Sequence, residues 1–373
     1  MNVLVLNWRD IKHPRAGGAE VRFHRIYEDI ARAGHKVVLI ASRFAGAPDS
    51  EVLGGIEVHR VGSDATYAAL CLRHLPEWEK RFNIDMVVED FNKLPLLSPW
   101  RTRKPLLIQM HHLWKGSIFH EDSFFTALIV WLGEQTLRIV YRKERFCVVS
   151  DSTRNELHGM GIPLDRIAII HNGVDLAFYQ PPPDPAREQS VLWLGRIQKY
   201  KGVLDVCRAF QKIAAKYPRL TLRIAGTGPY KHKVEAWVRK AGLSGRILFP
   251  GFVSEEEKRT LLQRSLFLVQ SSYKEGWGLT VIEANACGTP VIANNAPGLR
   301  DSVRDGVSGL LYQFRSVDSL AEKMQQLMDD APLYSELCGK VRGWAEQFKW
   351  DTAGQETLAL LQDVYQRRLQ RNG

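Results

Sequence analysis

The segment Glu275–Glu283 carries two carboxylates eight positions apart, with the turn Gly276-Trp277-Gly278 directly after the first. An apolar, helical pattern follows the turn, so we expect Glu275 in a loop and Glu283 about one and a half turns into a helix. Glycines let the backbone approach a ligand closely. A helix that begins near Gly278 directs free N–H groups and its positive dipole end into the loop, which favours phosphate. The segment therefore predicts an anion-binding site.

Two cations lie at another corner of this kind. Arg196 and Lys201 follow the apolar run Val191–Leu194, which reads as a strand, and precede a helical pattern. Positive side chains so placed can clamp a diphosphate and stabilise it as it leaves. Two further turns rich in glycine or proline follow expected strands and bring backbone toward the carboxyl edge of the sheet. One contains Gly226 and Gly228, and the other contains Val253.

These segments resemble the family 4 retaining glycosyltransferases, enzymes of GT-B fold that move a sugar from a nucleotide donor. The E-x7-E spacing with its Gly-aromatic-Gly turn and the G-R-x4-K-G pattern at 195–202 carry the resemblance. It implies that Glu275 orients the donor sugar, while Glu283 binds the ribose hydroxyls. Arg196 and Lys201 would hold the diphosphate. The other donor-binding residues that the resemblance implies are Gly18, Gly226, Gly228, Val253, Gly276, Trp277, Gly278, Leu279 and Thr280.

The first half of the chain supplies a glycine turn and a pair of histidines. Gly18 opens the first expected helix, without the G-x-G-x-x-G spacing of a dinucleotide site. The resemblance implies that this turn approaches the donor phosphate. His111 and His112 follow the expected strand Leu106–Gln109, where the family places a histidine near the sugar and the acceptor. We take His111 as this catalytic histidine, and His112 stays open because the family more often has His-Asp or His-Glu.

Glu89 and Asp90 end a neighbouring expected strand, and either carboxylate is a candidate for contact with the acceptor. A purely structural role, such as a loop ion pair or a helix cap, is the competing interpretation. The turn Asn172–Asp175 resembles the family's N-G-V-D turn, which is mainly structural.

Short apolar runs alternate with helical patterns along the whole chain, and Pro181–Pro185 separates two such series. The alternation predicts an α/β protein with two Rossmann-like domains, residues 1–180 and 181–350, facing an inter-domain cleft. We expect the last helix, 351–373, to cross back to the first domain, as in the GT-B fold. Thr153 and Glu156 have the spacing of a capping box at the start of a further helix.

The 373 residues carry a net charge of +10, and 181–373 hold most of it, with 28 basic against 20 acidic residues. This excess suits an anionic ligand, but the sequence contains no nucleic-acid-binding module. Five scattered cysteines without a C-x2-C pair, and no signal peptide, indicate a cytoplasmic protein. Asp-x-Asp motifs and a third ligand beside the histidines are absent, so we expect neither metal nor other cofactor.

The stretch Phe124–Arg145 begins apolar and ends basic. A helix of this kind docks on an anionic membrane face or packs into a core with its charges outward. The first interpretation would place the protein peripherally at the inner face of the cytoplasmic membrane, and both stay open.

The residues and the resemblance together predict a metal-independent, retaining hexosyltransferase. Its donor would be a nucleotide sugar, UDP-glucose or another UDP-hexose, and its acceptor a glycan or lipid-linked glycan in exopolysaccharide or cell-envelope synthesis. Four alternatives stay open: a GDP-mannose-dependent mannosyltransferase, a glycan phosphorylase, a sugar-nucleotide epimerase, and a non-catalytic nucleotide-sugar-binding protein.

Overall fold

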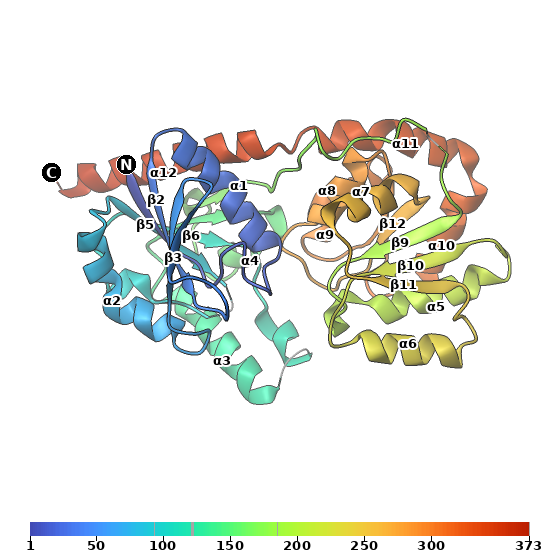
Figure 1. The fold of residues 1–373 in the computed structure, drawn as a ribbon, viewed down its shortest axis with the longest axis horizontal. Coiled ribbons are helices and arrows are strands. Elements are labelled where there is room, and N and C mark those ends of the chain that lie inside the picture. The colour runs from blue at the N-terminus through green and yellow to red at the C-terminus, as the bar shows by residue number, and fades with distance from the viewer. Residues whose placement is uncertain (93, 121–122, 185, 373) are drawn as a thin grey trace. The chain divides into compact units, whose positions relative to one another are not determined.

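The structure is a computed structural model that describes the chain apart from residues 93, 121–122, 185 and 373 (Figure 1). The chain divides into two compact units, of which the first comprises 1–173 and 350–373 and the second comprises 174–349. The division thus precedes the proline-rich stretch 181–185, whose last residue lies outside the described part. The first unit includes the C-terminal helix, which begins at Trp350.

The first unit contains one sheet, whose described strands have the order β3-β4-β2-β1-β5-β6-β7-β8. All neighbours pair in parallel except β3 and β4. Its strands are β1 Asn2–Leu6, β2 Lys36–Ser42, β3 Ser50–Leu53, β4 Ile56–Val61, β5 Met86–Phe91, β6 Leu106–Met110, β7 Arg145–Val148 and β8 Ile167–Ile169. Its helices are α1 Gly18–Arg32, α2 Tyr67–Arg81, η1 Ser98–Trp100, η2 Lys115–His120, α3 Phe124–Gln135, η3 Thr136–Arg138, α4 Asp151–His158, η4 Leu164–Arg166 and α12 Trp350–Asn372.

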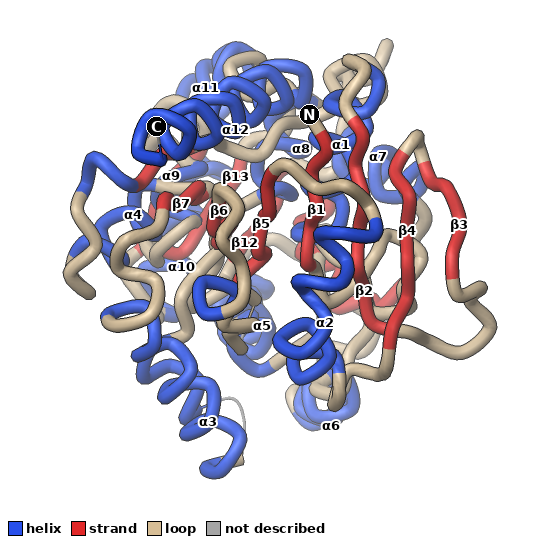
Figure 2. Tube along the Cα trace, turned by 90° about the vertical axis from the view of Figure 1, so that its left-hand side faces the viewer, coloured by secondary structure: helices blue, strands red, loops and turns tan. Residues whose placement is uncertain are grey.

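Helices cover both faces of this sheet because side chains alternate along each strand. Val3 and Val5 of β1 point into a core that α1 and α12 complete, whereas Leu4 and Leu6 point into a core with α2 and α4. Helices α1 and α12 pack against each other on this face, and Figure 2 labels both near the upper end of β1.

Helix α3 of the first unit is buried on one side only. Ala127 and Val130 are buried, whereas Phe124, Phe125 and Ile129 are exposed. The prediction that the apolar residues of this helix pack into the core is therefore wrong for its outer side. Among the described residues, no helix is long and apolar enough to cross a membrane.

The second unit contains a parallel sheet whose described strands have the order β11-β10-β9-β12-β13-β14. Its strands are β9 Ser190–Leu194, β10 Thr221–Ala225, β11 Ile247–Gly251, β12 Phe267–Gln270, β13 Val291–Asn294 and β14 Gly309–Tyr312. Its helices are η5 Lys199–Lys201, α5 Val203–Ala214, α6 Lys231–Lys240, α7 Glu255–Arg264, α8 Leu279–Ala286, α9 Leu299–Ser302, α10 Val317–Asp329 and α11 Ala331–Ala345. Both units are therefore α/β and Rossmann-like.

The predicted capping box of α4 is wrong. Ser150, not Thr153, has extended backbone and caps the helix, and its hydroxyl accepts the N–H of Thr153 at 3.3 Å. Thr153 lies inside the helix and donates to the carbonyl of His111 at 3.2 Å. The serine three residues earlier takes the cap because it comes directly after β7 and its loop, where the backbone is still extended.

Candidate active-site residues

Each sheet contains a point at which the strand order reverses, between β1 and β5 in the first unit and between β9 and β12 in the second. Ligands of open α/β sheets bind beyond the carboxyl ends of strands at such points. In the second unit, Arg196 and Lys201 follow β9, and Glu275 follows β12. In the first unit, Gly18 follows β1 and Asp90 ends β5. These five residues therefore lie at the two switch points, whereas His111 follows β6 and Val253 follows β11.

Lys201 and Glu275 form an ion pair in the second unit, with 2.5 Å between Nζ and Oε1. The two side chains are 17% and 19% exposed, so the pair is shielded but still reachable. Burial lowers the pKa of Lys201, but the charges of Glu275 and Tyr200 more than offset that effect, and its pKa is raised. Lys201 therefore stays a cation. Arg196 is exposed and close enough for its charge to act on Lys201.

Glu283 lies in the middle of α8 and pairs with Lys258 of α7, with 3.0 Å between Nζ and Oε1. Burial raises the pKa of Glu283, and Lys258 only partly offsets this effect. Its other oxygen, Oε2, is buried and accepts no hydrogen bond from the described residues. A buried acceptor without a donor is costly. The Glu283 side chain as a whole is 13% exposed, and the Tyr179 hydroxyl lies close enough to its carboxylate to counter part of the rise in its pKa.

The glycines at 226 and 228 are required by packing between loops. A Cβ at Gly226 would lie 1.9 Å from the carbonyl oxygen of Gly195, and one at Gly228 would lie 2.3 Å from that of Ile197. The turn after β10 therefore rests directly on the loop that carries Arg196. The close contact at these two glycines fixes the backbone position of Arg196. The same absence of side chains also lets the backbone come close to a ligand.

The loop of Glu275 is held in a similar way. A Cβ at Gly298 would lie 2.2 Å from the carbonyl oxygen of Glu275. Gly298 also has a φ of 80°, which residues with a side chain rarely adopt. Trp277 is buried, with its ring 5.1 Å from that of Phe348, so its packing role is structural. Gly278 is the N-cap of α8, as the sequence predicts.

The remaining residues predicted to bind the nucleotide sugar lie near the N-termini of α8 and α7. Gly276 precedes Trp277 in the buried part of the loop, and Leu279 and Thr280 form the half-buried first turn of α8. The hydroxyl of Thr280 accepts from Gln270 Nε2 at 2.8 Å, which ties the helix to β12. Val253 directly precedes Ser254, the N-cap of α7.

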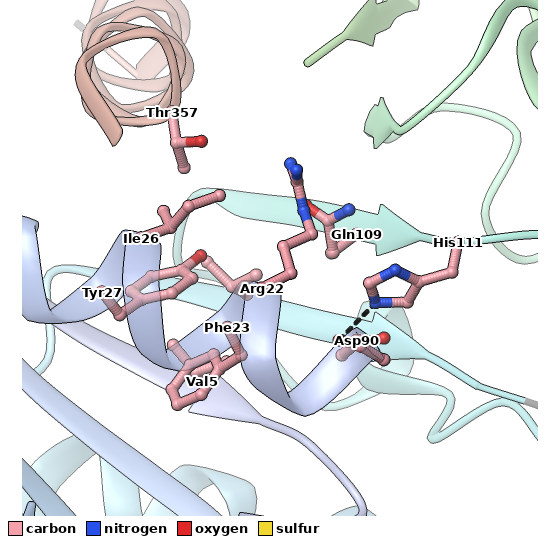
Figure 3. Close-up of a pocket in the computed structure, with 11 residues that line it drawn as sticks. Val5, Arg22, Phe23, Ile26, Tyr27, Asp90, Gln109, His111 and Thr357 are labelled. Carbon is pink, nitrogen blue, oxygen red and sulfur yellow. Dashed lines mark hydrogen bonds and ion pairs between the residues drawn. The ribbon is translucent and has the colours of Figure 1, made fainter. Parts of the chain in front are cut away.

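In the first unit, His111 lies beside Asp90, with 3.1 Å between Nε2 and Oδ2 (Figure 3). Because Nε2 is engaged by the carboxylate, Nδ1 is the ring nitrogen that remains for other contacts. His112 packs instead against Trp114, with ring centroids 5.0 Å apart. The structure thus separates the two histidines: one has a carboxylate partner and the other an aromatic one.

A small cavity adjoins His111, lined by Asp90, Gln109, Arg22 and apolar residues of α1 (Figure 3). Its free volume of about 10 Å³ is far below the roughly 300 Å³ of a small-molecule pocket. Arg22 is buried and donates to Asn172 Oδ1 at 2.8 Å and to the carbonyl of His171 at 3.3 Å. The cavity is therefore a packing gap beside His111 and too small to bind a ligand. Asn172 has the structural role expected of its turn, because it accepts a hydrogen bond from Arg22.

Glu89 and Asp90 have different environments although they are neighbours. Glu89 is fully buried and accepts from the N–H groups of Leu96 and Ser98 and from the hydroxyls of Ser98 and Tyr141. Burial raises its pKa despite these donors. The structural interpretation of Glu89 is therefore the right one, because its carboxylate holds the loop at 96–98 and does not reach solvent.

Gly18 begins α1 behind Gly17, whose N–H donates to Glu20 Oε2 at 2.7 Å. Glu20 thus caps the helix from its own first turn. Burial raises the pKa of this glutamate.

The sequence analysis missed two residues. Lys258 is one turn into α7, and no local motif ties it to Glu283, 25 residues later in the chain. Arg22 lies among the apolar residues Phe23, Ile26 and Tyr27 of α1, and a charge on an apolar stripe was the available signal. In the part of the chain that the structure describes, no three His, Cys, Asp or Glu side chains cluster as metal ligands would.

Comparison with known families decides the identity. Residues 16–178 match the family described as Glycosyltransferase Family 4, and residues 179–342 match the one described as Glycosyl transferases group 1. The two matches run consecutively through both units.

The chain belongs to the family 4 glycosyltransferases. A relative of this glycosyltransferase is an uncharacterized glycosyltransferase of Methanocaldococcus jannaschii, 23% identical over 96% of this chain and 97% of the relative. A D-inositol 3-phosphate glycosyltransferase of Streptomyces bingchenggensis is 31% identical over 72% of this chain and 63% of the relative.

Solved structures show that this glycosyltransferase has the GT-B fold. The sucrose-phosphate synthase of Thermosynechococcus elongatus aligns with a TM-score of 0.82 at 21% identity, over 98% of this chain and 99% of that one. The Anabaena protein HepE, solved in complex with UDP-glucose, aligns with a TM-score of 0.78 at 18% identity, over 97% and 100%. WaaG, involved in lipopolysaccharide biosynthesis, aligns with a TM-score of 0.78 at 18% identity, over 96% and 99%.

Proposed function

We propose that this glycosyltransferase transfers a hexose, with retention and without a metal ion, from a UDP-hexose to a glycan or lipid-linked glycan. UDP-glucose is the first candidate donor, supported by the likeness to HepE, which was solved with that ligand. The likeness to WaaG, a protein of lipopolysaccharide biosynthesis, supports a role in exopolysaccharide or cell-envelope synthesis.

The observation that carries the proposal is the environment of Glu283. One carboxylate oxygen pairs with Lys258, the other is buried near the Tyr179 hydroxyl, and the side chain as a whole is 13% exposed. The vicinal hydroxyls of a ribose would donate to this carboxylate, which can accept two hydrogen bonds. With its ribose bound to Glu283, a nucleotide would place its diphosphate near the first turn of α8.

The chemistry follows from the charges near that turn. As the sugar–phosphate bond breaks, negative charge grows on the diphosphate, and Lys201, Arg196 and the N–H groups at Gly278 stabilise it. Glu275 orients the sugar through its hydroxyls, and its ion pair fixes the position of Lys201. The acceptor hydroxyl attacks the face from which the diphosphate leaves, and a phosphate oxygen takes its proton. His111, fixed by Asp90, contributes a hydrogen bond to the reacting sugar.

Hydrolysis of a panel of nucleotide sugars without acceptor tests the proposal, with chromatography of the released nucleotide. We expect UDP-glucose to be hydrolysed fastest among UDP- and GDP-sugars. Preference for GDP-mannose would indicate a mannosyltransferase, and tight binding without turnover of any donor or acceptor would indicate a binding protein. Release of a sugar phosphate with phosphate as co-substrate would indicate a phosphorylase, and a changed sugar configuration an epimerase.

A further inference from the structure

Three polar side chains of the second unit act on Glu283 by direct contact or by charge. Lys258 Nζ lies 3.0 Å from Glu283 Oε1 and 2.8 Å from Glu255 Oε2. The Tyr179 hydroxyl donates to the same oxygen of Glu255 at 2.6 Å. Burial, together with the nearby charge of Glu283, raises the pKa of this tyrosine. The four side chains form one connected group, which we call the Glu283 cluster.

The Glu283 cluster joins three segments that are far apart in the sequence. Tyr179 is buried, and its N–H donates to the carbonyl of Asp175 at 2.8 Å. Glu255 and Lys258 lie at the start of α7, which contacts α8, the helix of Glu283 (Figure 1). The Lys258 ammonium lies over the Tyr179 ring, 5.3 Å from its centre. Backbone and ring contacts therefore hold Tyr179 and Lys258 in place beside Glu283.

Of the four side chains in the Glu283 cluster, two are carboxylates and one is a cation. Lys258 is shared between the carboxylates, and Tyr179 donates its single proton to Glu255. Glu283 therefore keeps capacity to accept from further donors, because a carboxylate has about four lone-pair sites. An ion pair that only tied α7 to α8 would need neither a second carboxylate nor the tyrosine. The composition of the cluster thus favours a role toward a ligand.

Lys258 determines whether Glu283 accepts hydrogen bonds as an anion. Burial raises the pKa of Glu283, and the charge of Lys258 is the largest effect in the opposite direction. Without that charge, burial would favour the protonated acid. A protonated carboxyl group turns one acceptor site into a donor, and its hydrogen bonds with hydroxyl groups are weaker. The lysine thus sets how strongly Glu283 can hold two neighbouring hydroxyls.

We propose that Lys258 and Tyr179 are positioning residues, which keep Glu283 ionised and oriented toward both hydroxyls of a ribose. The site thereby selects ribonucleoside diphosphate sugars over their 2′-deoxyribose counterparts. A 2′-deoxyribose keeps only the 3′-hydroxyl, so the carboxylate loses one charge-assisted hydrogen bond. Because Glu283 binds the ribose in the proposed function, this selectivity rests on that function.

Titration calorimetry of the full-length protein with UDP and with 2′-deoxy-UDP tests the proposal, because the two ligands share the base and the diphosphate. We expect the wild type to bind 2′-deoxy-UDP roughly ten- to a hundredfold more weakly than UDP, the range for a hydrogen bond to a charged group. Lys258→Met keeps the length of the side chain but not its charge. In this variant the ratio of the two affinities should fall to about threefold, as for a neutral hydrogen bond. Lys258→Arg should keep most of the wild-type ratio.

Tyr179→Phe removes only the hydroxyl and should lower the wild-type ratio by a smaller factor, about threefold. Two matched variants serve as controls. Lys340→Met removes a lysine of α11 that pairs with Glu336, and Tyr217→Phe removes a hydroxyl that donates to Asp329. Both should keep the wild-type ratio. Circular dichroism verifies that each variant is folded.

The proposal is overturned if the wild type binds UDP and 2′-deoxy-UDP equally well. It is also overturned if Lys258→Met weakens both ligands by the same factor, which would make Lys258 a structural tie between α7 and α8. A wild type that binds GDP in place of UDP would contradict the proposed donor, and the ratio of GDP to 2′-deoxy-GDP then decides the role of Lys258. Discrimination without turnover of any nucleotide sugar would contradict the proposed transfer but not this role. Binding of neither nucleotide would overturn both.

Discussion

The two units hold their charged side chains in different ways. In the second unit, Lys201 lies beside Glu275 and Lys258 beside Glu283, so both lysines are already partnered by carboxylates. In the first unit, buried Arg22 is held by an amide and a carbonyl. A ligand that contacts either lysine of the second unit must rearrange an ion pair, whereas Arg22 of the first unit is held by neutral groups beside the His111–Asp90 pair. Substitutions should therefore be strong and coupled in the second unit, and weaker and separable in the first.

The largest expected effect is that of Glu275→Ala. Transfer should fall about a thousandfold, because in the proposed reaction the carboxylate orients the sugar, and in the structure it pairs with Lys201. Affinity for UDP should change much less, since Lys201 keeps its charge. Initial rates and calorimetry measure the two quantities, with Glu256→Ala, an exposed glutamate of α7, as the control. Wild-type turnover by Glu275→Ala would remove this residue from the site.

Lys201→Ala should weaken UDP binding by roughly ten- to a hundredfold, the range for a hydrogen bond to a charged group. The double variant with Glu275→Ala should show a non-additive effect, because the two side chains form one ion pair. Titration calorimetry gives these affinities, and Lys212→Ala of α5 is the control. Unchanged UDP affinity in Lys201→Ala would mean that the diphosphate binds elsewhere.

Glu283→Gln should weaken UDP binding about tenfold, since the amide accepts less strongly than a carboxylate and repels an incoming donor with its NH2. The raised pKa of Glu283 also predicts a stability effect. Between the ordinary pKa of a glutamate and the raised one, the folded state binds more protons than the unfolded state, so stability falls as pH rises through this window. Thermal melts across that window should flatten in Glu283→Gln. An identical slope in both proteins would show that Glu283 titrates normally.

Asp90→Asn and Glu89→Gln form a matched pair on β5. Asp90→Asn should lower kcat about tenfold by releasing the His111 ring, with little change in Tm. Glu89→Gln should lower the free energy of unfolding by about 1–3 kcal/mol, because an amide has one acceptor oxygen for the buried groups that donate to the two carboxylate oxygens. Its kcat should be nearly unchanged. Kinetics and thermal melts separate the two outcomes. If Asp90→Asn only destabilised the protein, Asp90 would be structural like its neighbour.

The smallest expected effect is that of chelation. Activity should survive EDTA, because in the proposed reaction Lys201, Arg196 and the start of α8 supply the positive charge that a metal would otherwise bring. Loss of activity that manganese restores would contradict the metal-free reaction.

The sequence predicts those parts of the fold that depend on uninterrupted apolar runs, since strands buried on both faces need them. It does not reveal β3, in which exposed and half-buried residues alternate, β4, in which buried and half-buried residues alternate, or the short β8. In the site, Lys201 and Glu275 were found because each lies in a local motif. The pairing of Lys258 with Glu283, and that of Asp90 with His111, depend on which strands and helices become neighbours, and that information is not local.

The division of the chain has a consequence for biosynthesis. The second unit is inserted in the first, and its ends lie together, because the N–H of Val174 donates to the carbonyl of Phe348 at 3.0 Å. Leu360, Leu361 and Val364 of α12 belong to the core beneath β1 and α1. Strands β1 and β2 therefore lack part of their hydrophobic core until α12 has been synthesised. The second unit can fold before α12 is synthesised. If synthesis stops before α12, the released chain therefore contains a folded second unit and an incomplete first unit.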